Sequence, residues 1–238
     1  MQFTKGKKIS LIKKGIYSAI GIPALGLGLS FFTFGTYLNS SGFNFLQSFL
    51  SSFFAFALPG QFVMAETLLS GGNLLNIFLA VLLTNARLFP MTVYLIPIIK
   101  NNNTPKWQLF LICHLVAATA WINMLEIKKK TKKKHRLEFF TGYAGFLWLN
   151  SVIFTLLGYL SSNFITTEIL IGMVFFNPMY FLALTISNFK EKKLYIIFFL
   201  SVFFTPIFYF ISSDWAVLLS GFLSGVIAHL YIKKFKLW

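Results

Sequence analysis

Long apolar runs separated by short polar segments determine what this chain of 238 residues can fold into. A bilayer core is about 30 Å thick, and a helix of about 20 residues spans it. Hydrophobic residues make up 57% of the chain and charged residues 11%, too few to cover a water-facing surface. About eight runs satisfy the length requirement: Gly15–Leu38, Phe45–Leu69, Leu74–Ile99, Trp107–Ile127, Phe139–Leu160, Glu168–Ser187, Leu194–Ile211 and Trp215–Ile232. The sequence therefore predicts an all-α, polytopic integral membrane bundle of about eight transmembrane helices, in one domain over residues 1–238.

The basic residues are placed between these runs. The net charge of +15 would suggest a nucleic-acid partner in a soluble protein, but no basic patch accompanies a soluble module here. Cytoplasmic loops of membrane proteins carry an excess of Lys and Arg. With the N-terminus inside, the basic clusters all fall on one side: Lys5–Lys14, Lys128–Arg136, Lys190–Lys193 and Lys233–Lys236. We expect both termini, including residues 1–14, and the loop 128–138 to be cytoplasmic, and no nucleic-acid partner.

The sequence offers no recognisable catalytic or metal site. Cys113 is the single cysteine, so an intrachain disulfide is excluded. No group of His, Cys, Asp and Glu has metal-ligand spacing, and no nucleophile or nucleotide-binding motif is present. We therefore expect no metal, no cofactor and no enzymatic activity.

Arg87 is the main exception to the rule that membrane spans avoid charge. It falls near the middle of the third run, where a central Arg costs about 2.5–3.5 kcal/mol on insertion scales. Asn85 places a second polar group two residues earlier. One interpretation is a site for an anionic group such as an amino-acid carboxylate, which suits bidentate guanidinium contact. The alternative is a structural pairing of Arg87 with Glu66 or with backbone carbonyls.

The second run contains Pro59-Gly60, which predicts a break in the helix, with Gln61 beside it. Such breaks occur where the backbone is packed in protein or lines a cavity, and transporters build midplane sites from them. A simple kink without a ligand is the alternative. Further polar support or coupling is expected from Glu66, His114 and Asn123, although Glu66 also suits the membrane interface and His114 suits ordinary hydrogen-bonded packing.

At this point the sequence resembles the AzlC family, the large subunits of two-component branched-chain amino acid exporters. The resemblance lies in Phe56-Ala-Leu-Pro-Gly-Gln-Phe62, Leu69-Ser-Gly-Gly-Asn73, Leu83-Thr-Asn-Ala-Arg87 and Pro97, and more weakly in Gly15–Gly28. It implies a permease of the bacterial cytoplasmic (inner) membrane and a small AzlD-type membrane subunit as partner. It also implies functional roles for Gln61, Asn85 and Arg87.

One departure from the family pattern concerns the fourth run. Many members carry a Thr-Asp-Glu element there, whereas this chain reads His114-Leu-Val-Ala-Ala-Thr-Ala-Trp121, without an acid. If that element couples protons or recognises the substrate amine, this protein differs in coupling or substrate. His114 or Asn123 would then be the residues to replace it.

The sequence thus predicts a permease subunit that exports branched-chain or other small hydrophobic amino acids by secondary transport. Arg87 would bind the carboxylate, and Pro59, Gly60, Gln61 and Asn85 would complete the substrate site, with backbone freed near Pro59 helping to bind the ammonium. The alternatives are a non-transporting structural membrane subunit and a membrane-embedded lipid-modifying enzyme.

Overall fold

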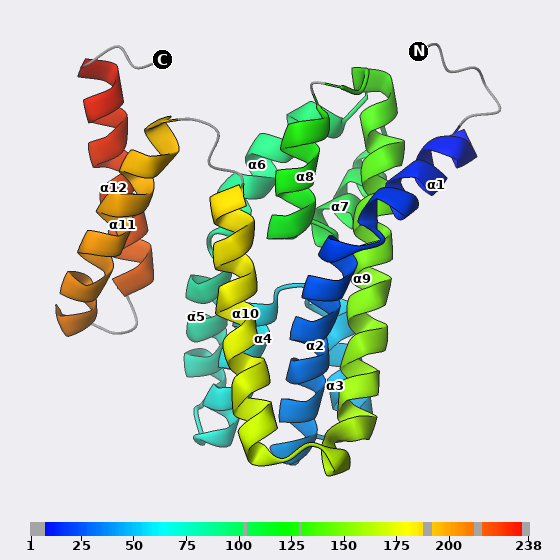
Figure 1. Ribbon diagram of the computed structural model, residues 1–238, viewed down its shortest axis with the longest axis vertical. Coiled ribbons are helices and arrows are strands. Elements are labelled where there is room, and N and C mark those ends of the chain that lie inside the picture. The colour runs from blue at the N-terminus through cyan, green and yellow to red at the C-terminus, as the bar shows by residue number, and fades with distance from the viewer. Residues whose placement is uncertain (1–7, 102–103, 129, 188–191, 212–215, 235–238) are drawn as a thin grey trace. The chain divides into compact units, whose positions relative to one another are not determined.

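The computed structural model describes residues 8–101, 104–128, 130–187, 192–211 and 216–234. Throughout these residues the regular structure is helical (Figure 1). The helices are α1 (Lys8–Ala19), α2 (Ile22–Ser40), α3 (Phe45–Phe54), α4 (Leu58–Leu69), α5 (Leu74–Asn85), α6 (Leu88–Ile99), α7 (Lys106–His114), α8 (Ala118–Ile127), α9 (Arg136–Ser161), α10 (Thr167–Ser187), α11 (Lys192–Ile211) and α12 (Ala216–Lys234). The predicted all-α class is confirmed.

The chain divides into two compact units, Met1–Tyr180 and Phe181–Trp238, which we describe separately. In the second unit α11 packs against α12, and Thr205 Oγ1 donates to Ser220 Oγ across that pair at 3.0 Å. Parts of the basic clusters lie outside the described residues, namely 1–7, 129, 188–191 and 235–238.

Each of the first four predicted spans is two shorter helices. Breaks separate α1 from α2, α3 from α4, α5 from α6 and α7 from α8, with bends of 63°, 48° and 117° in the first, third and fourth pairs. The four later runs coincide with the single helices α9 to α12. By length and composition, one described helix, Lys133–Phe164 with its flanking 3-10 turns, is able to cross a membrane, and the number rises to four if each bent pair counts as one span.

Local conformation explains two of the breaks. Gly21, between α1 and α2, has a φ of 114°, a conformation that other residues rarely adopt. The break predicted at Pro59-Gly60 is present in the second run, and it falls in the turn directly before Pro59, which itself lies in the first turn of α4. Proline is tolerated there because the amide hydrogens of the first turn have no intrahelical acceptor. The break lies at Ala55–Ala57.

Helix α9, which runs along the right-hand side of the first unit in Figure 1, packs closely against α1 and α2. Glycines make this possible from both sides of the contact. A Cβ atom at Gly35 of α2 would fall on the backbone of Thr155, and one at Gly158 of α9 would fall on the carbonyl of Phe32. A Cβ atom at Gly15 of α1 would likewise fall on the backbone of α9, at the carbonyl of Phe139. Small residues of this kind allow helix backbones to approach directly.

Interhelical hydrogen bonds reinforce this contact. Thr36 Oγ1 donates to the carbonyl of Gly158 at 3.1 Å, and Asn39 Nδ2 donates to the carbonyl of Tyr159 at 2.8 Å. In the opposite direction, Asn150 Nδ2 of α9 donates to the carbonyl of Ala24 at 3.0 Å. These bonds fix the register of α2 along α9 because each joins a side chain to one particular carbonyl.

The glycine contact predicts a specific stability difference within α9. Gly158→Ala should lower the free energy of unfolding by about 1–3 kcal/mol, because its Cβ meets the backbone of α2. Gly145→Ala is the matched control, since no atom lies within 4 Å of its Cβ position and alanine favours a helix by about 0.5–1 kcal/mol. Thermal unfolding of the two purified variants measures the difference, and equal midpoints would contradict the packing.

Candidate functional site

The polar residues singled out in the sequence lie at the ends of the broken helices. Pro59, Gly60 and Gln61 form the first turn of α4, Asn85 is the last residue of α5, and Arg87 directly precedes α6. His114 is the last residue of α7. Helix ends leave backbone groups without intrahelical partners, so these positions combine polar side chains with unsatisfied backbone.

Gly60 and Asn85 are in direct contact, and this is the main juxtaposition in the site. Helix α4 packs along α5, and the side-chain amide of Asn85 occupies the space that a Cβ at position 60 would need. The Oδ1 atom of Asn85 is buried and has no hydrogen-bond partner within the described part of the chain. Only glycine at position 60 lets the Asn85 amide lie against the first turn of α4.

Gln61 is buried, with 2% of its surface exposed. Its Nε2 donates to Ser51 Oγ at 3.1 Å and lies 3.5 Å from Ser52 Oγ. Ser52 Oγ in turn forms a 2.8 Å hydrogen bond with Thr155 Oγ1 of α9. The amide is therefore held by α3 and, through Ser52, by α9, while Gln61 Oε1 is left without a partner among the described residues.

Arg87 lies in the turn between α5 and α6, where a mid-helix position was expected. Its side chain is exposed in this chain, and so is that of Glu66. Within the described ranges the two form no ion pair, so the structural pairing with Glu66, left open by the sequence, is not made. In the sequence, Arg87 follows two residues after Asn85, whose side-chain oxygen has no partner among the described residues.

His114 has a structural partner. Its Nε2 lies 3.1 Å from the carbonyl oxygen of Phe53, and Trp148 Nε1 donates to the same oxygen at 3.1 Å. Phe53 is in the last turn of α3, where carbonyls have no intrahelical donor. His114 and Trp148 thus cap the broken end of α3. The sequence does not reveal this role of Trp148, because nothing in an apolar helix marks one indole as a cap.

Asn123 lies on α8, which contacts α6 and α9. Its Oδ1 is buried and unpartnered in the described structure, as are Thr119 Oγ1 and Trp121 Nε1 on the same helix. The Trp121 ring packs near Tyr94 of α6, with 6.4 Å between centroids. Buried polar atoms without partners are uncommon in proteins, and several of those found here belong to the broken helices α4, α5 and α8.

The chemistry offered by α4 and α5 is that of a hydrogen-bond acceptor site with a cation nearby. Gln61 and Asn85 each present a buried amide oxygen, which is suited to accept from an ammonium or another donor. Arg87 offers a guanidinium, suited to a carboxylate. No group of three or more His, Cys, Asp or Glu that would suit a metal occurs among the described residues.

Comparison with known proteins gives one match. The model of the family described as AzlC protein matches residues 23–165, which is more than half of the chain and includes every candidate site residue. This confirms the resemblance inferred from the second and third runs. No curated protein and no solved structure matches the chain.

The shared cap on Phe53 predicts non-additive stability losses. Because either donor still satisfies the carbonyl, His114→Phe and Trp148→Phe should each cost about 0.5–1.5 kcal/mol. The double variant leaves a buried carbonyl unsatisfied, which adds about 1–3 kcal/mol. Thermal unfolding of the single and double variants measures the coupling, and strictly additive losses would argue against a shared cap.

Proposed function

The chain belongs to the AzlC family of membrane transport proteins, and we propose that it is a permease that exports branched-chain or other small hydrophobic amino acids. The observation that carries this proposal is the pair of unpartnered amide oxygens of Gln61 and Asn85 beside the first turn of α4. Such oxygens are costly in an apolar interior unless a ligand supplies donors. The ammonium of an amino acid is a ligand of that chemistry.

We propose that the substrate lies between these oxygens and Arg87. Gln61 Oε1 and Asn85 Oδ1 accept hydrogen bonds from the ammonium, and Arg87 binds the carboxylate in a bidentate manner. Pro59 supports the site by beginning α4 at the position that brings Gly60 against Asn85. Apolar side chains accept the substrate side chain. Backbone freed near Pro59, in the break at Ala55–Ala57, helps to bind the ammonium.

In the proposed membrane arrangement the four broken pairs and the four later helices, α9 to α12, each cross the bacterial cytoplasmic membrane, which gives about eight spans. Non-helical backbone at membrane depth is tolerated where protein surrounds it, and the capped carbonyl of Phe53 meets this condition. The Lys and Arg clusters then face the cytoplasm together with both termini. The whole chain forms one permease domain.

Transport in this proposal is secondary, driven by the substrate gradient or the proton-motive force. His114 acts as a cap and not as a proton relay, because its ring nitrogen is committed to the Phe53 carbonyl. Asn123 and Glu66 are left as candidates for coupling or polar support. A small AzlD-type membrane subunit completes the exporter.

Arg87→Lys tests the carboxylate contact. Lysine keeps the charge but not the bidentate geometry, so export should fall at least tenfold, which corresponds to about 1.4 kcal/mol. The measurement is efflux of labelled leucine from cells that express the chain with its small neighbouring subunit, alongside resistance to toxic leucine analogues. Lys100→Gln, which removes a charge outside the site, is the control. Normal efflux with Arg87→Lys would overturn the assigned role, and reduced assembly would indicate a structural subunit.

Gly60→Ala and Asn85→Ala should weaken substrate binding equally, because each change removes the Asn85 amide from the site. The new Cβ displaces the Asn85 amide from its place, so either change removes one ammonium ligand and should weaken substrate binding about tenfold. The double variant should be no worse than either single variant. Gly145→Ala is the control. Multiplicative losses in apparent leucine affinity would show that Gly60 and Asn85 act separately.

A further inference from the structure

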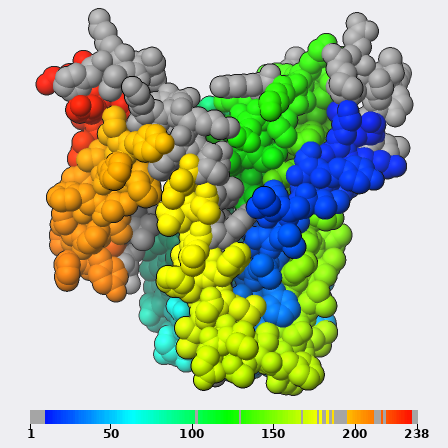
Figure 2. Space-filling view, viewed as in Figure 1, coloured from blue at the N-terminus to red at the C-terminus, as the bar shows by residue number. Residues whose placement is uncertain are grey.

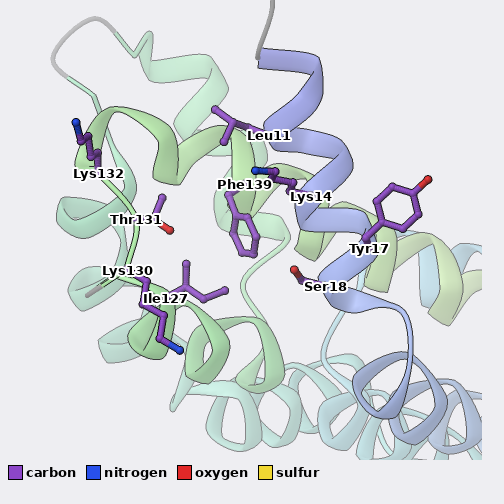
Figure 3. Close-up of a pocket in the computed structure, with 9 residues that line it drawn as sticks. All are labelled: Leu11, Lys14, Tyr17, Ser18, Ile127, Lys130, Thr131, Lys132 and Phe139. Atoms are coloured by element: carbon purple, nitrogen blue, oxygen red, sulfur yellow. The ribbon is translucent and has the colours of Figure 1, made fainter. Parts of the chain in front are cut away.

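The structure has a cavity of about 510 Å³ between α1 and the segment that joins α8 to α9, and Phe139 of α9 contributes to its lining (Figure 3). Helix α1, which forms one of its walls, lies at the surface of the molecule (Figure 2). Among the described residues that line this cavity, none belongs to the proposed substrate site. What the substrate site recognises therefore depends on how Gln61 and Asn85 are oriented in the packed interior.

Gln61 begins a series of hydrogen bonds that runs from α4 through α3 to α9. Its Nε2 lies 3.1 Å from Ser51 Oγ and 3.5 Å from Ser52 Oγ. Ser52 Oγ lies 2.8 Å from Thr155 Oγ1, which in turn lies 2.9 Å from the carbonyl oxygen of Ser151. Ser52, Thr155 and Ser151 are fully buried, so the hydroxyls in this series depend on one another for hydrogen-bond partners.

The last bond of this series determines the direction of the others. The Ser151 carbonyl can only accept, so the single hydroxyl hydrogen of Thr155 is donated to it. Thr155 Oγ1 then accepts the hydrogen of Ser52, which is thereby used. Ser52 consequently presents a lone pair to Gln61, which suits the NH₂ group of the amide and not its oxygen. The series therefore directs Nε2 toward the serines and leaves Oε1 as the end without a partner among the described residues.

Ser51 alone does not select one orientation of the Gln61 amide. A serine hydroxyl both donates and accepts, so it can bond either the NH₂ group or the oxygen of an amide. Ser52 differs because Thr155 takes its hydrogen. The choice between the two orientations of Gln61 is therefore made by Thr155, through Ser52.

Helix packing holds both members of this pair in place. The backbone of Thr155 lies where a Cβ atom at Gly35 of α2 would fall, so α2 rests directly on it. Ser52 precedes Phe53, whose carbonyl is bonded by ring donors from α7 and α9. Neither side of the contact between Ser52 and Thr155 is therefore free to move away when the Gln61 amide turns.

From this geometry we propose that Thr155 is a positioning residue that makes the site specific for an ammonium group. Through Ser52 it keeps Gln61 Oε1 available to accept from the substrate. With the amide turned over, Nε2 would present its hydrogens to the ammonium, and two donors facing each other form no hydrogen bond. Thr155 acts in this way without contacting the substrate. The inference rests on the proposed function, because it concerns recognition at the same site.

The test variant is Thr155→Val, which removes the hydroxyl and nearly preserves the shape of the side chain. Ser52 can then donate to the oxygen of the Gln61 amide, so the amide is no longer held in one orientation. Thr155→Ser retains the hydroxyl and should behave as the wild type. Thr141→Val on the same helix is the matched control, because the Thr141 hydroxyl donates to the carbonyl of Leu137 of α9 itself, at 2.9 Å.

The first measurement is hydrogen exchange of the Gln61 side-chain NH₂ in the purified full-length protein, labelled with nitrogen-15 at its four glutamines. Gln61→Glu identifies the signal. We expect exchange at least tenfold faster in Thr155→Val, and within threefold of the wild type in Thr155→Ser and Thr141→Val, because only Thr155→Val frees Nε2 from the serines. Equal exchange in Thr155→Val and the wild type would overturn the positioning, whether or not leucine binds.

The second measurement is the affinity of the purified exporter for leucine, for 3-methylbutylamine, which keeps the ammonium, and for 4-methylpentanoate, which lacks it. In Thr155→Val the first two should bind about tenfold more weakly and 4-methylpentanoate should be unaffected, so the preference for leucine over 4-methylpentanoate falls about tenfold. Equal weakening of all three compounds would show a merely structural role and overturn the specificity assigned to Thr155. Equal binding of leucine and 4-methylpentanoate by the wild type would overturn the ammonium contact and with it the specificity role, whereas the exchange rate still decides the positioning.

Discussion

Direct backbone contact between α9 and the pair α1 and α2 is the constraint on which the rest of the first unit depends. The glycines at positions 15, 35 and 158 remove the side chains that would hold these helices apart. Helix α9 then presents Thr155 to Ser52, which helps to hold Gln61, and Trp148 to the broken end of α3. Through the same helix, Phe139 reaches the cavity beside α1. The proposed substrate site is therefore anchored on one packed helix.

The broken helices leave backbone and side-chain polar groups inside an apolar chain. Some of these groups have hydrogen-bond partners and others do not. At α3 the carbonyl of Phe53, which has no donor within the helix, is satisfied by two ring donors from α7 and α9. At α4, α5 and α8, amide, hydroxyl and indole atoms stay buried without partners in the part of the chain that is described. An unsatisfied buried group costs about 1–3 kcal/mol. We therefore interpret a break whose polar groups are satisfied as structural, and one whose buried polar atoms have no partner as a candidate binding site.

The sequence predicted the helical class, and each apolar run coincides with one helix or one broken pair, because runs of about 20 apolar residues are long enough for helices and too long for strands. It predicted the break in the second run, which lies directly before Pro59. It did not predict the breaks in the third and fourth runs, because the residues there, around Arg87 and at Leu115–Ala117, include neither proline nor glycine. Gly60, Gln61 and Asn85 could be proposed from the sequence because polar or flexible residues stand out in apolar runs. The Trp148 cap and the contact of Asn85 with Gly60 depend on distant packing, which one sequence does not reveal.

We propose that one bound amino acid supplies the donors that Gln61 and Asn85 lack and the carboxylate that suits Arg87. Competition against labelled leucine binding to the purified exporter tests this proposal. We expect leucine to compete, whereas 3-methylbutylamine, which lacks the carboxylate, and 4-methylpentanoate, which lacks the ammonium, should each compete at least tenfold more weakly. Equal competition by either analogue would show that one of the two polar contacts contributes nothing and would overturn the proposed site.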